Sequence, residues 1–187
     1  VAKDVNYKVE HYQMNVDGKT FSLKETETKT GPTGSKTAAA AKPYAGFTCT
    51  GTTQGGSNST IEQATIAGNG STVVKVYYDR NRYKFTLKAG TGATTKGSTL
   101  SGSYLFGATI KLVGAAKEGY EWSHWASSNT DLVNDLGVAA TEFTMPTGDI
   151  TMTATAEPAK TVYKVEHYKM TLSGEDYELA STEEKKG

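Results

Sequence analysis

A segment near the N-terminus recurs near the C-terminus, and this repeat constrains the fold more than any other feature of the sequence. The run Tyr7–Tyr12 reappears as Tyr163–Tyr168, an offset of 156 residues, and the match continues without a gap to Gly187. Thirteen of the 25 positions from 7 to 31 are identical. The chain therefore contains slightly more than one period of a tandem array, and we expect the array to continue beyond it. Because 156 residues are too many for one solenoid repeat, we interpret the period as a pair of small domains.

Chain length and charge narrow the classes of protein further. A chain of 187 residues can build two small hydrophobic cores. Twenty basic residues balance twenty acidic ones, without the basic patch expected of a nucleic-acid-binding protein. The sequence also lacks an apolar run of about 18 residues, so we expect no membrane insertion.

Most of the local signals are those of β-strands. Tyr83, Phe85 and Leu87 alternate with lysine and threonine, which places the apolar side chains on one face of a half-buried strand. Similar alternation occurs over residues 74–78 and 150–156.

Helical signals are short. Ser35 can cap a turn or two over residues 38–41, which Pro43 would end. Asn129 or Thr130 can cap a second segment that carries Leu132, Val133 and Leu136 and ends at Gly137. We therefore predict a strand-dominated α+β fold, in which each small domain has a mixed sheet with at most one short helix.

The first half of the period resembles the mucin-binding-protein (MucBP) repeat family. The residues that carry the resemblance are Tyr7–Tyr12, Gly18, Gly31, Thr33-Gly34, Ala41–Phe47, Gly70, Val73, Val74 and Val76–Arg80. The second half resembles the Listeria-Bacteroides or internalin B-repeat family. Here the residues are Gly119-Tyr120, Trp122, Trp125, Phe143–Pro146 and Asp149–Ala154.

These resemblances imply the domain division, the fold and the location. They imply a MucBP-like repeat at 4–81, an internalin B-repeat-like domain at 82–158, and the first hairpin of a further, truncated MucBP-like repeat at 160–187. Both families are similar to β-grasp (ubiquitin-like) folds and occur in strings on bacterial surface proteins. The resemblance thus implies an extracellular location, attached to the cell wall through regions outside this sequence.

The sequence offers no constellation of catalytic residues. Its histidines are His11, His124 and His167, and His11 and His167 are repeat equivalents, so a histidine-based metal cluster is not expected. We interpret His11 as a partly buried, hydrogen-bonded imidazole and the single cysteine, Cys49, as a small buried filler. We therefore predict a non-enzymatic protein without a metal or cofactor.

Aromatic side chains are the best candidates for ligand binding. Stacking on a glycan would use exposed rings, and the candidates are Tyr44, Tyr104 and Phe106, the last two forming an exposed pair. Trp122 and Trp125 are better explained as core residues, because aromatic side chains bury much apolar area.

Two functions remain open at this point. The preferred one is a stalk or spacer in an adhesin, and the alternative is a module that recognises host mucin-type glycans or another surface carbohydrate. For the C-terminal segment we predict a hairpin over 160–187 with its turn near Ser173-Gly174. This hairpin would either be disordered or borrow a partner. The partner would be the end of the preceding domain or a sheet edge of a neighbouring chain, and the latter would give a dimer that is a product of truncation.

Overall fold

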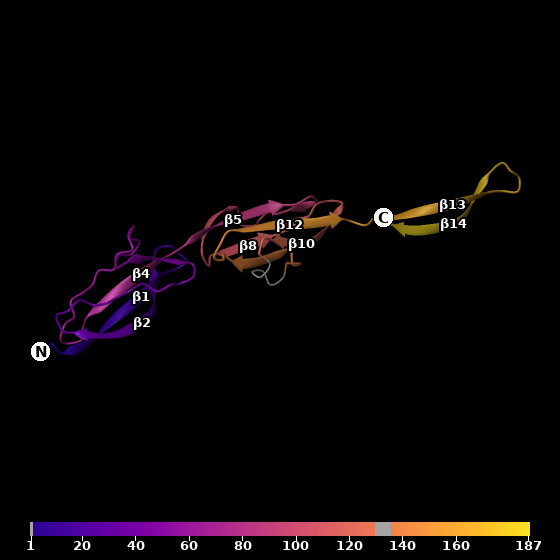
Figure 1. Cartoon of the computed structure of the whole chain (residues 1–187). Helices are drawn as coiled ribbons and strands as arrows, with labels where there is room; N and C mark the ends of the chain where they lie inside the picture. Colours follow the sequence, from indigo (N-terminus) through magenta and orange to yellow (C-terminus); the bar gives the residue numbers. More distant parts are fainter. Residues whose placement is uncertain (1, 130–135) are drawn as a thin grey trace.

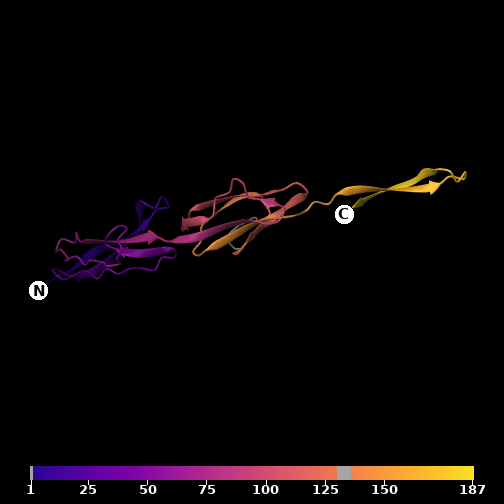
Figure 2. The same ribbon diagram turned by 90° about the horizontal axis from the view of Figure 1, so that it is seen from above.

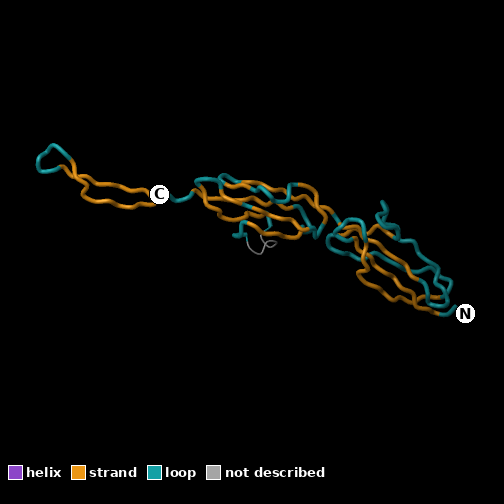
Figure 3. Tube along the Cα trace, turned by 180° about the vertical axis from the view of Figure 1, so that it is seen from behind, coloured by secondary structure: helices purple, strands orange, loops and turns teal. Residues whose placement is uncertain are grey.

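The computed structural model describes residues 2–129 and 136–187, and every regular element in this part of the chain is a β-strand (Figure 3). No helix in the described residues has the length and apolar character needed to cross a membrane. The strands are β1 Asp4–Met14, β2 Phe21–Pro32, β3 Phe47–Gly51, β4 Val73–Arg80, β5 Arg82–Ala89, β6 Ala93–Thr94, β7 Gly102–Leu105, β8 Thr109–Val113, β9 Ala115–Ala116, β10 Tyr120–Ser127, β11 Ala140–Thr144, β12 Ile150–Pro158, β13 Val162–Met170 and β14 Tyr177–Lys186.

The first four strands form one mixed sheet, which with its loops we call the first unit. The strand order is β2-β1-β4-β3. The central pair, β1 and β4, is parallel, and both outer pairs are antiparallel. Alternation along β1 buries Tyr7, Val9 and His11 on one face of this sheet.

Strands β5 to β12 form the second unit, and its main sheet has the same plan. The strand order is β10-β12-β5-β7, again with a parallel pair, β5 and β12, in the centre. The ribbon formed by β8 and β11 contributes Ile110, Leu112 and Phe143 to the same core as Phe85 and the buried residues of β12. In each unit the first strand therefore lies beside the last strand and parallel to it (Figure 1).

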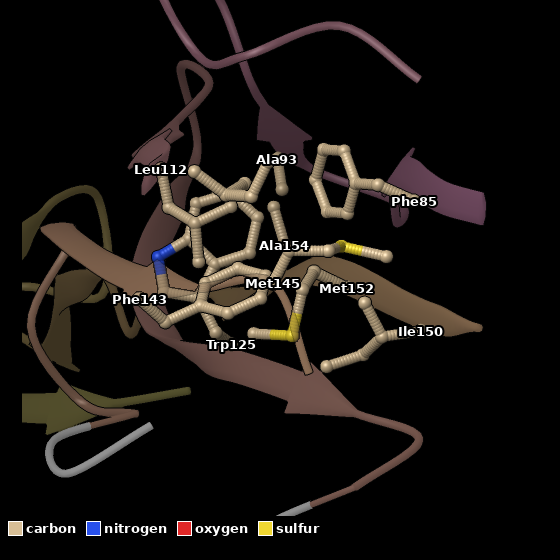
Figure 4. Close-up of a cluster of buried hydrophobic side chains, with 10 residues drawn as sticks. Phe85, Ala93, Leu112, Trp125, Phe143, Met145, Ile150, Met152 and Ala154 are labelled. Carbon is tan, nitrogen blue, oxygen red and sulfur yellow. The ribbon is translucent and has the colours of Figure 1, made fainter. Parts of the chain in front are cut away.

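Buried side chains form two separate clusters, one for each unit. The first cluster contains Tyr7, Val9, Ala39, Ile66, Val74, Val76 and Tyr78. The second, shown in Figure 4, contains Phe85, Ala93, Ile110, Leu112, Trp125, Phe143, Met145, Ile150, Met152 and Ala154. Strand domination and mixed sheets agree with the predicted fold.

The helix predicted over residues 38–41 is wrong, because this segment has no regular secondary structure. Its backbone groups bond to distant side chains: Ala38 N donates to the Tyr7 hydroxyl (2.9 Å) and Ala39 N to Gln63 Oε1 (2.8 Å). The Gln63 amide returns a bond to Ala39 O (2.9 Å). These tertiary bonds take the place of helical ones. Of the second predicted helix, residues 130–135 lie outside the described part of the chain.

The C-terminal strands β13 and β14 form an antiparallel hairpin beyond the second unit (Figure 2). Tyr163 pairs with Lys185 as Tyr7 pairs with Lys29 in the first unit. The bulge between His11 and Tyr12 also recurs in the hairpin, between the equivalent residues of β13. The register is the one that the 156-residue offset predicts. Gly174 has a φ of 74° and occupies the turn position of Gly18, which has a φ of 68°.

We expect Trp125→Ala to destabilise the second unit alone. Trp125 is fully buried in the second cluster, and truncation of such a side chain costs about 3–5 kcal/mol. That loss is comparable with the whole stability of a small domain. Amide hydrogen exchange of β5 should accelerate while that of β4 is unchanged. Val76→Ala, which truncates the first cluster, should show the converse pattern. Equal acceleration in both units by either substitution would contradict two independent cores.

Candidate functional site

Tyr44, the first of the predicted ligand-binding residues, belongs to a polar network on the buried face of the first sheet. Its half-buried ring packs edge-on against Tyr78, with ring centroids 4.9 Å apart and an interplanar angle of 85°. Its hydroxyl donates a hydrogen bond to the Glu25 carboxylate. Burial, followed by the hydrogen bond to Glu25 and then by its charge, raises the pKa of Tyr44 above its usual value. The hydroxyl is therefore held protonated and engaged within the protein.

His11 lies at the centre of this network and is fully buried. Its Nδ1 is 2.9 Å from the Tyr78 hydroxyl, which also accepts a hydrogen bond from Lys42 N (2.9 Å). Because the Tyr78 oxygen already accepts from Lys42, its proton is free to be donated to Nδ1. This arrangement favours the neutral tautomer with its proton on Nε2.

Glu27 supplies the charge next to His11. Its Oε1 lies 3.2 Å from His11 Nε2 and 2.7 Å from Lys42 Nζ. The contact with Nε2 does not have the geometry of a hydrogen bond. Hydrogen bonding to Lys42 lowers the pKa of Glu27 to about 2. Burial lowers the pKa of His11 below 6.5, and Glu27 only partly opposes this shift. Tyr78, His11 and Glu27 resemble an acid–base site in composition. A fully buried imidazole is inaccessible to a substrate, so we interpret the network as one that stabilises the fold.

Phe106 lies at the junction between the two units. Its ring contacts Phe47 of the first unit edge-on, with centroids 5.8 Å apart. The Arg80 guanidinium lies 4.8 Å from the centroid of the Phe47 ring and 5.7 Å from that of Phe106. Gly46 makes room for the Phe106 ring: its φ is 80°, and a Cβ there would lie 2.3 Å from a ring carbon.

Tyr104 packs against the second core. Its ring meets Phe85 edge-on at 6.1 Å, and its hydroxyl donates to Leu100 O (2.7 Å). The expectation that Tyr104 and Phe106 form an exposed pair is therefore wrong, because both rings are half-buried and packed against different parts of the chain. The structure does not bring the three candidate rings together into one surface.

The two tryptophans are core residues, as the sequence indicated. Trp125 is fully buried, and the half-buried Trp122 packs against it with ring centroids 5.4 Å apart. The Trp122 and Trp125 indole N–H groups donate to Gly137 O (2.8 Å) and Ala139 O (3.2 Å), respectively. Both polar atoms are thus satisfied within the second unit.

The remaining chemically active side chains lie apart from one another. His124 is exposed, and its Nδ1 lies 2.9 Å from the Ser123 hydroxyl and 3.1 Å from that of Thr155. Cys49 is half-buried and carries a free thiol. Within residues 2–129 and 136–187, no group of three or more His, Cys, Asp or Glu side chains is placed to hold a metal ion.

A pocket of about 390 Å³ lies where the second unit meets the hairpin. Its lining residues are Glu121, Trp122, Ser123, Glu157, Pro158, Lys160 and Lys186. Glu121 pairs directly with Glu157 across the sheet, a like-charge arrangement that is unfavourable by itself. The two lysines in the same lining offset this repulsion, which makes the pocket polar and balanced in charge.

Sequence reasoning missed an aromatic group on the open face of the first sheet. Tyr12 and Tyr77 pair across β1 and β4, with ring centroids 5.3 Å apart and an interplanar angle of 30°. Phe21 meets Tyr77 edge-on at 5.5 Å. The alternation that buries His11 and Tyr78 places their neighbours Tyr12 and Tyr77 on the opposite face, and this signal could have identified them.

Comparison with known proteins bears on the second unit. Residues 83–160 match the family model of a divergent InlB B-repeat domain. This finding agrees with the predicted internalin B-repeat resemblance of that segment. The MucBP resemblance of residues 5–81 stays a prediction. Neither a curated protein nor a solved structure matches the chain significantly.

We expect the first unit to lose stability as the pH falls below 6.5. His11 has a lowered pKa when folded, so the unfolded chain binds its proton at a higher pH than the folded chain does. The stability contributed by the neutral imidazole is fully present above pH 6.5 and declines below it. Glu27, with a pKa of about 2 instead of 4.5, adds a second loss between pH 4.5 and 2. Hydrogen exchange of the β4 amides between pH 7.5 and 5.5, corrected for intrinsic exchange, would measure the first loss.

His11→Gln removes the first titration and should flatten this pH dependence, although it also lowers stability at neutral pH. His167→Gln is the matched control, because His167 is the repeat equivalent and its side chain is 50% exposed. It should leave the pH dependence of the first unit intact. A slope that survives His11→Gln would show that another group is responsible.

Proposed function

We propose that this chain is a stiff spacer segment of a bacterial surface protein and that it acts without enzymatic chemistry. InlB B-repeats are bacterial surface domains, which supports this location for the matched unit. The 156-residue repeat supports a tandem array. The spacer would project another region of the protein from the cell wall, as in the stalk of an adhesin.

The observation that carries this proposal is the bonding at the junction between the units. Only Asn81 separates β4 from β5. Its N–H donates to Gly46 O (2.9 Å), and its carbonyl accepts from Phe106 N (2.8 Å). Its side-chain oxygen accepts from the Thr48 hydroxyl (2.7 Å). A linker held in this way differs from the flexible, solvated linkers that allow domains to move independently.

Arg80 strengthens the junction from the side of the first unit. Its Nε donates to Met14 O (3.0 Å), and its Nη1 donates to Phe106 O (2.8 Å) in the second unit. The same guanidinium lies against the Phe47 and Phe106 rings. Arginine is suited to this position, because its planar group can stack on rings while it donates several hydrogen bonds.

The strand order of the two sheets supports a common β-grasp ancestry for the units. Each sheet has parallel first and last strands in its centre and antiparallel strands at its edges. We infer on this basis that the first unit is the MucBP-like partner in a recurring pair. Parallel first and last strands also make the chain enter each unit at one end and leave at the other, which suits an extended array.

A second candidate function is recognition of surface carbohydrate, such as mucin-type glycans. The observation that favours it is the group of Tyr12, Phe21 and Tyr77 on the open face of the first sheet. Such rings can provide apolar stacking surfaces beside polar groups. Glu10, which accepts a hydrogen bond from the Tyr12 hydroxyl (2.8 Å), and Lys75 lie on the same face.

For the second candidate, we expect Tyr77→Ala to abolish any binding of the full chain to a glycan array. Tyr77 contacts both other rings, so its removal breaks the stacking surface. Tyr104→Ala is the control, because that ring packs against Phe85 within the second unit, away from the open face of the first sheet. Absence of glycan binding by the unmodified chain would exclude this candidate and leave the spacer proposal untouched.

For the spacer proposal, we expect Arg80→Ala to loosen the junction while both units stay folded. The hydrogen bonds and ring stacking of Arg80 together contribute about 2–4 kcal/mol to the contact between the two units. Spin labels on cysteines replacing Lys24 and Lys111, in a Cys49→Ser background, would report the distance distribution between the units. Arg80→Ala should broaden it. Arg82→Ala should not, because Arg82 bonds within the second unit to Ser103 O. A distribution that is already broad in the unmodified chain would refute the spacer proposal.

A further inference from the structure

A pull along the chain enters each unit at its first strand and leaves it at its last strand. β4 of the first unit passes through Asn81 alone into β5 of the second unit. β12 of the second unit passes through residues 159–161 into β13, the repeat equivalent of β1. The first and last strands of each unit are parallel neighbours, so a pull on the chain slides one strand along the other. We call these pairs, β1 with β4 and β5 with β12, the two clamps.

Sliding loads the hydrogen bonds of a clamp together and not one after another. In the first clamp, residues 8–13 of β1 lie beside β4, and Lys8 N donates a further bond to Thr72 O (3.0 Å). In the second clamp, residues 85–89 of β5 lie beside β12. The bonds of a parallel ladder are evenly spaced along the strands, so all of them resist the same displacement. Forced unfolding is governed by the barrier to this concerted rupture.

Side chains reinforce the first clamp on both faces of the sheet. On the buried face, His11 Nδ1 in β1 lies 2.9 Å from the hydroxyl of Tyr78 in β4. On the open face, the Tyr12 ring of β1 packs against the Tyr77 ring of β4, with centroids 5.3 Å apart. Both contacts must break before the two strands can slide.

Arg80 lies where the pull leaves β4. Its Nε donates to Met14 O of β1 (3.0 Å), and its Nη1 donates to Phe106 O of the second unit (2.8 Å). One guanidinium thus bonds the end of β4 both to the other strand of its clamp and to the next unit. A displacement of β4 along β1 stretches the bond to Met14 from the start.

The second clamp relies more on apolar contact. Its opposed buried side chains are apolar, as in the pair Phe85 and Ile150. One side-chain hydrogen bond, from Lys84 N to Asp149 Oδ1 (2.8 Å), supplements the ladder at one end. Apolar attraction is non-directional, whereas a hydrogen bond weakens steeply once its geometry is distorted. Small displacements therefore meet less resistance in the second clamp than in the first.

We propose that the chain bears tension, that each unit resists it by shear of its clamp, and that the first clamp is the stronger. The second unit then yields first, and the residues between β5 and β12 extend while β1 and β4 stay paired. This proposal rests on the spacer function, because a spacer that holds another region away from the cell is pulled from both ends.

The direction of pulling tests the clamp in the full chain by single-molecule force spectroscopy. In a Cys49→Ser background, cysteine handles in place of Lys3 and Lys84 pull on opposite ends of the first clamp and shear it. Handles in place of Lys3 and Ser71 pull on the same end and peel its strands apart bond by bond. All three handle positions are exposed. The rupture force should be at least about twofold higher in shear. Equal forces in the two directions would overturn the proposal.

The ranking of the clamps is tested with handles at Lys3 and Lys160, which should give two unfolding events at different forces. Tyr12→Ala removes the open-face contact of the first clamp and should lower only the higher force. Tyr168→Ala is the matched control, because Tyr168 is the repeat equivalent and lies outside the pulled segment. Leu23→Ala is a control within the first unit, since Leu23 lies opposite Tyr12 on β2, away from β4. Neither control should change either force.

Two outcomes of this second experiment would overturn the ranking: Tyr12→Ala lowers the smaller force, or it lowers neither force. Failure of the spacer proposal would be distinguishable, because it appears as a broad distance distribution between the units at rest. Force aligns the units whatever the stiffness of their junction, so the rupture forces report on the clamps alone.

Discussion

Each unit depends on a parallel pairing between its first and last strands. In the first sheet, Lys8 lies beside Val73 and Gln13 beside Tyr78, so the pairing closes a loop that contains the whole intervening chain. Closing such a long loop costs conformational entropy, which burial on one face of the sheet must offset. The same pairing also fixes the direction of the chain, because parallel strands place entry and exit at opposite ends of the unit. The end-to-end row seen in Figures 1 and 2 follows from this connection.

In the first unit, where residues 15–72 are all described, the crossover between the parallel strands contains no helix, which is unusual for a connection of this type. In place of helical hydrogen bonds, its backbone uses side chains as partners. Gln63 is central here: its oxygen accepts from Thr37 Oγ1 (2.9 Å) and Ala39 N (2.8 Å), and its nitrogen donates to Ala39 O. One amide thus joins the two arms of the crossover. The buried Ala39 and Ile66 can then cover β1 and β4 without leaving polar backbone groups unsatisfied.

Features that depend on local periodicity could be predicted from the sequence, and features that depend on distant partners could not. Alternation located the strand that carries Phe85, and the offset of 156 residues set the register of the C-terminal hairpin. The helix over 38–41 failed because its backbone bonds to Tyr7 and Gln63, which no local pattern reveals. Phe106 was misplaced for a similar reason, since its position depends on the space at Gly46 and on Arg80 across the junction.

The two copies of the run Tyr-Lys-Val-Glu-His-Tyr separate what local sequence decides from what tertiary context decides. Both copies form the same strand with the same bulge, and in both the second tyrosine donates to the glutamate two residues earlier at 2.8 Å. The pairing and this outward contact are therefore local properties. The environment of the histidine differs: burial against Tyr78 lowers the pKa of His11, whereas His167 is half-exposed. His167 also lies next to a carboxylate, 3.6 Å from Glu183 Oε1, so the proximity of histidine and glutamate belongs to the hairpin. Burial of the imidazole is consequently the property that the completed sheet adds.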